Sequence, residues 1–175
     1  MKPIEGWDLI NEAGDFKRLP AGIYGVKITK VVDNPKEQYF EVYCDIVKGE
    51  YANYFATKVQ NGGKDTSKSI RSYKDKALPF FKGFITAIEK TNPGYKWDWD
   101  ETKLVGKKVM AVFGEEEYLD ADGTIKVSTK VVEFRSLEAY EAGKLTVPPL
   151  KKLEQQPVEQ EPEEEPVPED DDFPF

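Results

Sequence analysis

The sequence predicts a mainly β domain, a five-stranded barrel with a helix between strands 3 and 4, followed by a disordered acidic C-terminal tail. Two early segments alternate apolar and polar residues, which is typical of strands with one buried face. Apolar residues recur at helical spacing in one later segment, residues 78–91. The end of the chain, residues 146–175, is dominated by Glu, Gln, Pro and Val.

The first two strands are expected at residues 22–32 and 38–47, joined by a turn at residues 33–36. In the first strand, the pattern places toward the core Tyr24, Val26 and Ile28. In the second strand, the core face holds Phe40, Val42, Cys44 and Ile46. The opposite face of that strand holds Tyr39, Glu41, Tyr43 and Asp45. The two strands are expected to form a hairpin with one buried face.

A third strand is expected at residues 51–59, before a flexible loop at residues 61–64. A helix follows, because four apolar residues share one helical face: Phe81, Phe84, Ile85 and Ile88. Pro79 fits only in the first turn of a helix, so this helix begins near Leu78 and ends at the Asn-Pro-Gly sequence of residues 92–94. The expected core includes Phe80, Phe81 and Phe84.

The last two strands are expected at residues 107–113 and 125–134, joined by an acidic turn at residues 115–122. A short helix around residues 137–140 closes the domain. Three strands, one helix and two strands is the order of the OB-fold, a small Greek-key barrel that binds oligonucleotides. The sequence therefore predicts an OB-fold-like domain over residues 1–145.

Charge is distributed unevenly along the chain. Residues 151–175 carry ten acidic side chains and two lysines, a net charge of −8, which equals the formal net charge of the whole chain. Residues 1–150 are therefore neutral overall, and the acidic average describes the tail and not the domain. A segment such as residues 146–175 buries too little apolar surface to offset its conformational entropy, so we expect it to be disordered.

Composition excludes several kinds of chemistry. The chain contains no histidine and a single cysteine, Cys44, which removes Ser-His-Asp and Cys-His catalysis, the usual zinc sites and an intrachain disulfide. No apolar run approaches the roughly 20 residues that span a membrane, and the N-terminus lacks the apolar stretch of a signal peptide. We expect a cytoplasmic protein that is not an enzyme and has no catalytic residue, cofactor or metal.

The chain ends in three aspartates and two phenylalanines separated by a proline: Asp170, Asp171, Asp172, Phe173, Pro174 and Phe175. Aromatic side chains at the end of a disordered tail gain nothing for the free protein, so they indicate a peptide that docks on a partner. This ending resembles the C-terminal tip of bacterial single-stranded-DNA-binding proteins, although Phe173 stands where that family has an aliphatic residue. The resemblance implies that these six residues recruit replication, recombination and repair enzymes.

Three stretches of the body carry a second resemblance: GEYANYF at 49–55, LPFFKGFI at 78–85 and LVGKKV at 104–109. They resemble single-stranded-DNA-binding proteins of phages and mobile elements of Gram-positive bacteria. The resemblance extends over about residues 19–141. It implies a viral or mobile-element protein of DNA replication or recombination that works in a bacterial cytoplasm.

Binding of single-stranded DNA without sequence preference needs basic groups for phosphates and flat aromatic side chains for base stacking. Residues 58–76 carry six basic and two acidic side chains, which predicts a basic loop that closes over the strand. The expected phosphate contacts are Lys27, Lys58, Lys64, Lys68, Arg71, Lys74 and Lys107. The expected stacking residues are Tyr39, Tyr43 and Tyr54, unless they pack against neighbouring segments. Trp97 and Trp99 either stack on bases or close one end of the barrel.

Two other functions stay open from the sequence. One is a host-interaction decoy that uses the acidic tip and binds no DNA. The other is a magnesium-dependent nuclease that uses Asp98, Asp100 and the carboxylates of residues 115–117, although a solvated acidic turn is the simpler interpretation of the latter. Because one small barrel offers limited contact to DNA, self-association into a homo-oligomer also stays open.

Overall fold

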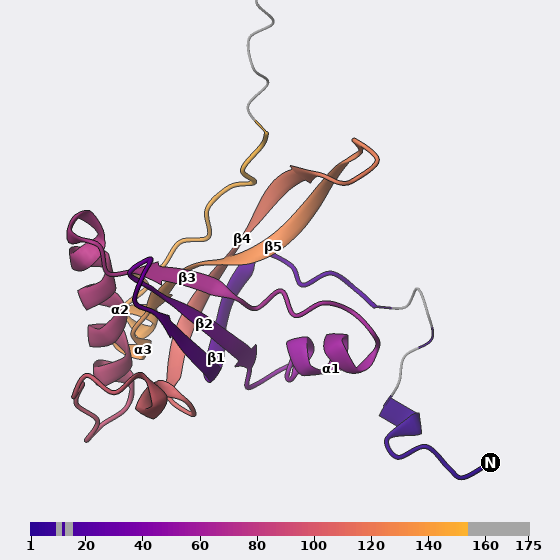
Figure 1. Ribbon diagram of the computed structural model, residues 1–175, viewed down its shortest axis with the longest axis horizontal. Coiled ribbons are helices and arrows are strands. Elements are labelled where there is room, and N and C mark those ends of the chain that lie inside the picture. Colours follow the sequence, from indigo (N-terminus) through magenta and orange to yellow (C-terminus); the bar gives the residue numbers. More distant parts are fainter. Residues whose placement is uncertain (10–11, 13–15, 154–175) are drawn as a thin grey trace, which may run out of the picture.

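The computed structural model describes residues 1–9, 12 and 16–153. Its main feature is one five-stranded antiparallel sheet in the order β3-β2-β1-β4-β5 (Figure 1). The strands are β1 (Gly22–Asn34), β2 (Tyr39–Ile46), β3 (Ser69–Ser72), β4 (Lys108–Leu119) and β5 (Ile125–Arg135). The helices are α1 (Tyr54–Gln60), α2 (Leu78–Thr91) and α3 (Leu137–Glu141), with 3-10 turns at Trp7–Leu9, Asp75–Ala77 and Glu101–Leu104.

The mainly β architecture and the helix between the third and fourth strands are confirmed, because α2 lies between β3 and β4 in the chain. The sheet is open: in the described part of the chain, no backbone pairing joins the edge strands β3 and β5. One side chain spans this gap. The guanidinium of Arg71 in β3 lies 4.8 Å from the ring centre of Phe134 in β5, and its Nη1 donates to the carbonyl of Val132 at 3.5 Å.

The predicted hairpin of β1 and β2 is confirmed in its position and in its faces. Val26 and Ile28 of β1 are fully buried, as are Val42 and Cys44 of β2. This inner face packs with α2 and α1 into one core, together with Phe113 of β4. A bulge between Ile28 and Lys30 shifts the register of the hairpin, so the alternation of β1 changes phase at that point.

The predicted strand at residues 51–59 is wrong, because this segment forms α1. Tyr54 and Phe55 are adjacent on one helical face and both are buried. The helix also receives a cap from outside its own segment: the buried carboxylate of Asp45 accepts hydrogen bonds from the backbone N–H groups of Phe55 and Ala56 at 3.0 and 2.9 Å. The third strand is instead β3, the short edge strand beside β2.

The helix α2 has the predicted bounds, and its core face buries Phe84, Ile85 and Ile88. Phe80 was expected in the core, but its side chain is 80% exposed. It precedes the apolar i, i+3, i+4, i+7 series of this helix by one residue, and a rotation of about 100° per residue turns it away from the sheet. None of the helices in the described ranges is both long and apolar enough to cross a membrane.

The predicted acidic turn is also wrong in its placement. Glu115, Glu116 and Glu117 belong to β4, which extends with β5 into a long two-stranded arm that projects from the rest of the sheet (Figure 1). The turn itself is short and lies around Asp120 and Gly123, where Gly123 adopts a φ of 76°.

The chain returns to this arm after α3. Lys151 forms a backbone bridge beside Glu116, with its N–H donating to the carbonyl of Glu115 at 2.9 Å. The first part of the predicted tail therefore lies against β4, and the domain boundary after residue 145 stays a prediction. The remainder of the tail, residues 154–175, lies outside the described residues, as do the tip residues within it.

Candidate nucleic-acid interface

The sheet face opposite the core brings together four of the ten predicted DNA contacts, Lys27, Tyr39, Tyr43 and Lys68. Residues that face each other across antiparallel strands point to the same side of a sheet. The register pairs Lys30 with Tyr43, and Tyr39 with Ser72. By this register, and by an ion pair that adds Lys68, the outer face comprises Lys27, Lys30, Val32, Asn34, Tyr39, Glu41, Tyr43, Lys68, Ile70 and Ser72.

Tyr43 lies at the centre of the outer face, and its ring is held from two sides. The Nζ of Lys30 lies 5.2 Å from the ring centre, a cation–π distance. The hydroxyl of Tyr43 donates to the carboxylate of Glu41 at 3.1 Å. Burial and this hydrogen bond raise the pKa of the Tyr43 hydroxyl, so it stays neutral at physiological pH. The ring is thus a preorganised, half-buried stacking surface beside a lysine.

Tyr39 lies farther along β2, where its hydroxyl accepts a hydrogen bond from the side-chain amide of Asn34 at 3.0 Å. Ile70 of β3 is 47% exposed and lies opposite Glu41. The outer face therefore combines two tyrosine rings with exposed apolar surface, which is the composition that base stacking requires.

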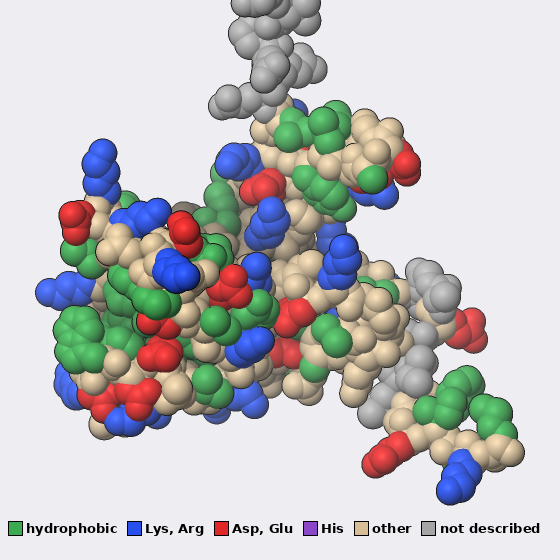
Figure 2. Space-filling view, in the orientation of Figure 1, with side chains coloured by type: hydrophobic (Ala, Val, Ile, Leu, Met, Phe, Trp, Pro, Cys, Tyr) green, Lys and Arg blue, Asp and Glu red, His purple; other side chains and the backbone are tan. Residues whose placement is uncertain are grey.

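The electrostatics of the outer face are positive. Lys27, Lys30 and Lys68 lie on it, with one partly buried carboxylate, Glu41, 3.6 Å from Lys68. The exposed carboxylate of Asp65, on the loop before β3, also helps to raise the pKa of Tyr43. Asp45 shares the register position opposite Lys27, but its side chain is buried and bonded to α1. On the molecular face visible in Figure 2, basic and acidic side chains are interspersed.

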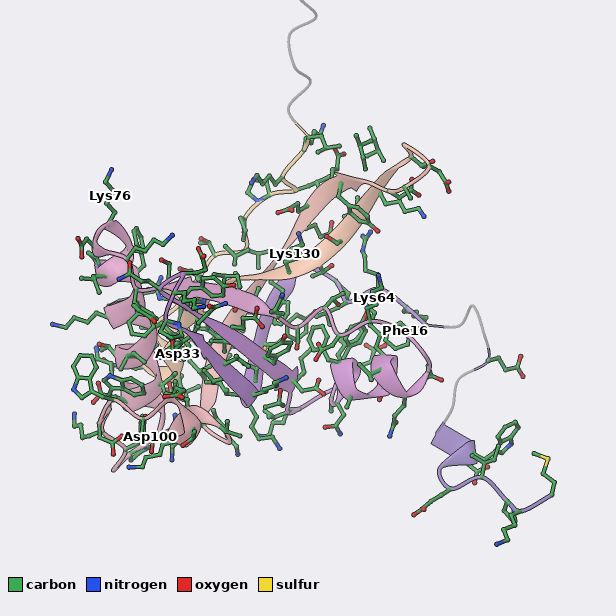
Figure 3. The ribbon with its side chains drawn as sticks, viewed as in Figure 1. Phe16, Asp33, Lys64, Lys76, Asp100 and Lys130 are labelled. Carbon is green, nitrogen blue, oxygen red and sulfur yellow. The ribbon has the colours of Figure 1, made fainter. Side chains whose placement is uncertain are left out.

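The predicted basic loop is divided among several places. Lys58 belongs to α1, where its Nζ donates to Thr66 at 2.9 Å and burial lowers its pKa. Lys64 is exposed on the loop beside α1 (Figure 3), and Lys74 is exposed just after β3. Of the predicted basic residues, only Lys68 joins Lys27 on the outer face.

Two predicted contacts lie elsewhere and need correction. Tyr54 is only 9% exposed, and its hydroxyl accepts from the N–H of Leu19 and donates to the carbonyl of Lys17, both at 2.9 Å. It is a core residue that anchors the N-terminal segment, so its ring is not available for stacking. Arg71 pairs with Phe40 across β3 and β2, which turns its side chain to the inner side of the sheet.

Lys107 and the tryptophans lie at the end of the connection between α2 and β4. The Nζ of Lys107 lies 4.7 Å from the ring centre of Tyr95, with which it forms a cation–π contact. Trp97 packs edge-on against the core residue Phe40, with ring centres 6.3 Å apart, and so closes one end of the core. Trp99 lies beside Trp97 but is 84% exposed.

Several carboxylates of β4 and of the turn after it pair with bases that the sequence pattern did not connect to them. Glu116 pairs with Lys130 at 2.9 Å, and Asp120 with Lys126 at 2.7 Å. These lysines lower the pKa of both carboxyl groups. The acidic arm is therefore a ladder of cross-strand ion pairs, with Arg18 adding a contact to Glu115 at 3.3 Å.

The carboxylates invoked for a nuclease are not brought together. Asp98 and Asp100 both contact Lys103, near the end of α2. Figure 3 places Asp100 near the lower end of α2, well apart from Lys130, the partner of Glu116, at the base of the arm of β4 and β5. Within residues 1–9, 12 and 16–153, no group of three or more acidic or cysteine side chains is placed to hold a metal ion.

Sequence reasoning missed Lys30, Val32 and Ile70. Strict alternation from Lys27 would place Thr29 and Val31 on the outer face, and the bulge after Ile28 replaces them with Lys30 and Val32.

No family model matches the chain, and no curated protein matches it either.

Proposed function

We propose that this protein binds single-stranded DNA without sequence preference, along the outer face of β1, β2 and β3. The observation that carries the proposal is the Tyr43 ring, fixed beneath Lys30 and flanked by Lys27 and Lys68. An aromatic surface stacks on any base, and the lysines neutralise phosphates of any sequence. The protein would protect exposed strands during replication or recombination.

The fold supports this proposal. In the OB-fold, a partly open five-stranded barrel, the face of the second and third strands binds oligonucleotides. We infer that the present sheet is such a barrel, whose edges β3 and β5 approach each other at Arg71 and Phe134. The aromatic and basic residues of β2 and β3 then lie where this fold binds its ligands. The acidic tip would recruit replication or repair enzymes in a bacterial cytoplasm.

The direct test is fluorescence anisotropy with a labelled oligothymidine, measured across a salt series and competed with duplex DNA. We expect binding that resists duplex competitor. Its logarithmic salt slope should approach about −2, since three lysines each contribute about 0.7 on a single strand. Absence of binding even at low salt would contradict the proposal and would favour the decoy alternative.

Tyr43 provides a sharper test. Replacing Tyr43 by Ala should weaken binding to oligothymidine by about 1–3 kcal/mol, because a stacked base loses its partner. Replacing it by Phe keeps the ring and loses only the hydrogen bond to Glu41, so affinity should change little. The two variants are compared by anisotropy at one salt concentration. Equal affinities for the Ala and Phe variants would show that the ring does not stack.

A further inference from the structure

A groove of about 820 Å³ lies between α2, β5 and α3, on the inner side of the sheet and away from the outer face. Its floor is apolar and includes Phe84, Phe134 and Ala139. Two apolar side chains on its rim are largely exposed, Phe80 at 80% and Val132 at 48%. The size and lining suit a short peptide with aromatic side chains.

The groove is also basic. Its lining includes five basic residues, Arg71, Lys82, Lys90, Arg135 and Lys144, and two acidic ones, Glu133 and Glu138. Glu133 already contacts Arg135 at 3.5 Å. The groove thus carries an excess of positive charge, in a chain whose residues 1–150 are neutral overall.

Arg71 strengthens this positive field from the edge of the groove. Its Nε and Nη2 are buried and have no hydrogen-bond partner among the described residues. Burial lowers its pKa to about 10, which still leaves the guanidinium charged at neutral pH. A buried cation without full compensation is costly, and an anion bound nearby would offset that cost.

The chain itself contains a segment of complementary chemistry. Residues 154–175 carry ten carboxylates and no basic side chain, and Phe173 and Phe175 lie directly after the aspartates. The backbone N–H of Leu153, the last described residue, donates a hydrogen bond to the carboxylate of Glu117 in β4 at 3.1 Å. Residues 154–175 extend up to roughly 75 Å, whereas a domain of this size is only about 40 Å across. The tip therefore reaches the groove.

We infer that the acidic aromatic tip, residues 169–175, docks in the groove between α2, β5 and α3 of its own chain. Phe173 and Phe175 would pack on the apolar floor, and the aspartates would face Lys90 and Lys144. This inference does not depend on DNA binding, because the groove and the outer face lie on different sides of the sheet. A partner that takes the tip would have to displace it from the groove.

The test uses the full chain with a photoreactive benzoylphenylalanine in place of Phe175, irradiated at low protein concentration and mapped by mass spectrometry. We expect crosslinks within one chain, to the groove around Phe80 and Val132. Replacing Lys90 and Lys144 by Glu should lower the yield about tenfold, since the charge attraction becomes repulsion. The matched control replaces Lys48 and Lys96 by Glu, both exposed outside the groove, and should leave the yield unchanged.

Crosslinks mainly to the outer face, crosslinks only between chains, or an equal loss in both charge reversals would overturn the inference. A second measurement needs no photoreactive group. Replacing Asp170, Asp171 and Asp172 by Asn in the full chain should accelerate hydrogen exchange at the α3 amides of Tyr140 and Ala142, which hydrogen-bond within the helix beside the groove. Unchanged exchange there would equally contradict docking.

Discussion

Replacing Lys27, Lys30 and Lys68 together by Glu should weaken binding to oligothymidine by about 100-fold or more at low salt, because each reversal removes a phosphate contact and adds a repulsive charge. The three side chains surround Tyr43 on one face of the sheet. All three would therefore contact the same bound DNA strand, and the loss of each contact weakens the same complex. The logarithmic salt slope should also fall in magnitude by about 2. Anisotropy across a salt series measures both quantities.

The matched control replaces by Glu three exposed lysines that lie outside the outer face: Lys48, Lys96 and Lys152. It changes the net charge of the protein by the same amount, so it reproduces the long-range repulsion between protein and DNA. We expect this control to lose only a small part of the affinity and to keep its salt slope. If both triple variants weaken binding equally, the outer face is not the interface, and the proposal fails even though the protein binds DNA.

Local pattern was sufficient to predict the elements whose periodicity is clear. The alternation from Phe40 to Ile46 places β2 and both of its faces correctly, and the spacing from Phe81 to Ile88 places α2. Both elements bury one face against the same core, so propensity, period and burial agree.

The third strand could not be found in this way. Tyr51, Tyr54 and Phe55 fit a short helix as well as a strand, and the group that caps α1, Asp45, lies in another element. The true strand β3 has only four residues, with Ser at both ends, and gains its hydrogen bonds from β2. Tertiary contacts decide such segments, and a single sequence does not display them.

The candidate interface was likewise predictable from the sequence only where local periodicity is clear. Tyr39 and Tyr43 follow from alternation alone, whereas Lys30 and Val32 reach the outer face through a bulge that no residue type signals. Arg71 illustrates the converse. It lies next to outer-face residues in the sequence, but alternation along β3 turns it inward, and an interpretation of this segment as a loop does not show that alternation.

Replacing Asp45 by Ala should lower the free energy of unfolding by about 3 kcal/mol, the largest stability effect that we expect from a polar side chain here. Its Oδ1 accepts from the N–H groups of Ile46 and Phe55 at 2.9 and 3.0 Å, and its Oδ2 accepts from Ala56 at 2.9 Å. Alanine leaves the buried donors at the start of α1 without partners. The loss extends further, because α1 holds Tyr54, the anchor of the N-terminal segment.

Urea unfolding of the full chain measures this effect as a lower midpoint at an unchanged slope. Replacing Asp45 by Asn keeps one acceptor oxygen for the helix, so its loss should be about half as large. The matched control, Asp75 to Ala, removes an exposed carboxylate and should stay within about 0.5 kcal/mol of the parent protein. An Asp45 variant as stable as this control would mean that α1 is held by the packing of Tyr54 and Phe55 alone, without its distant cap.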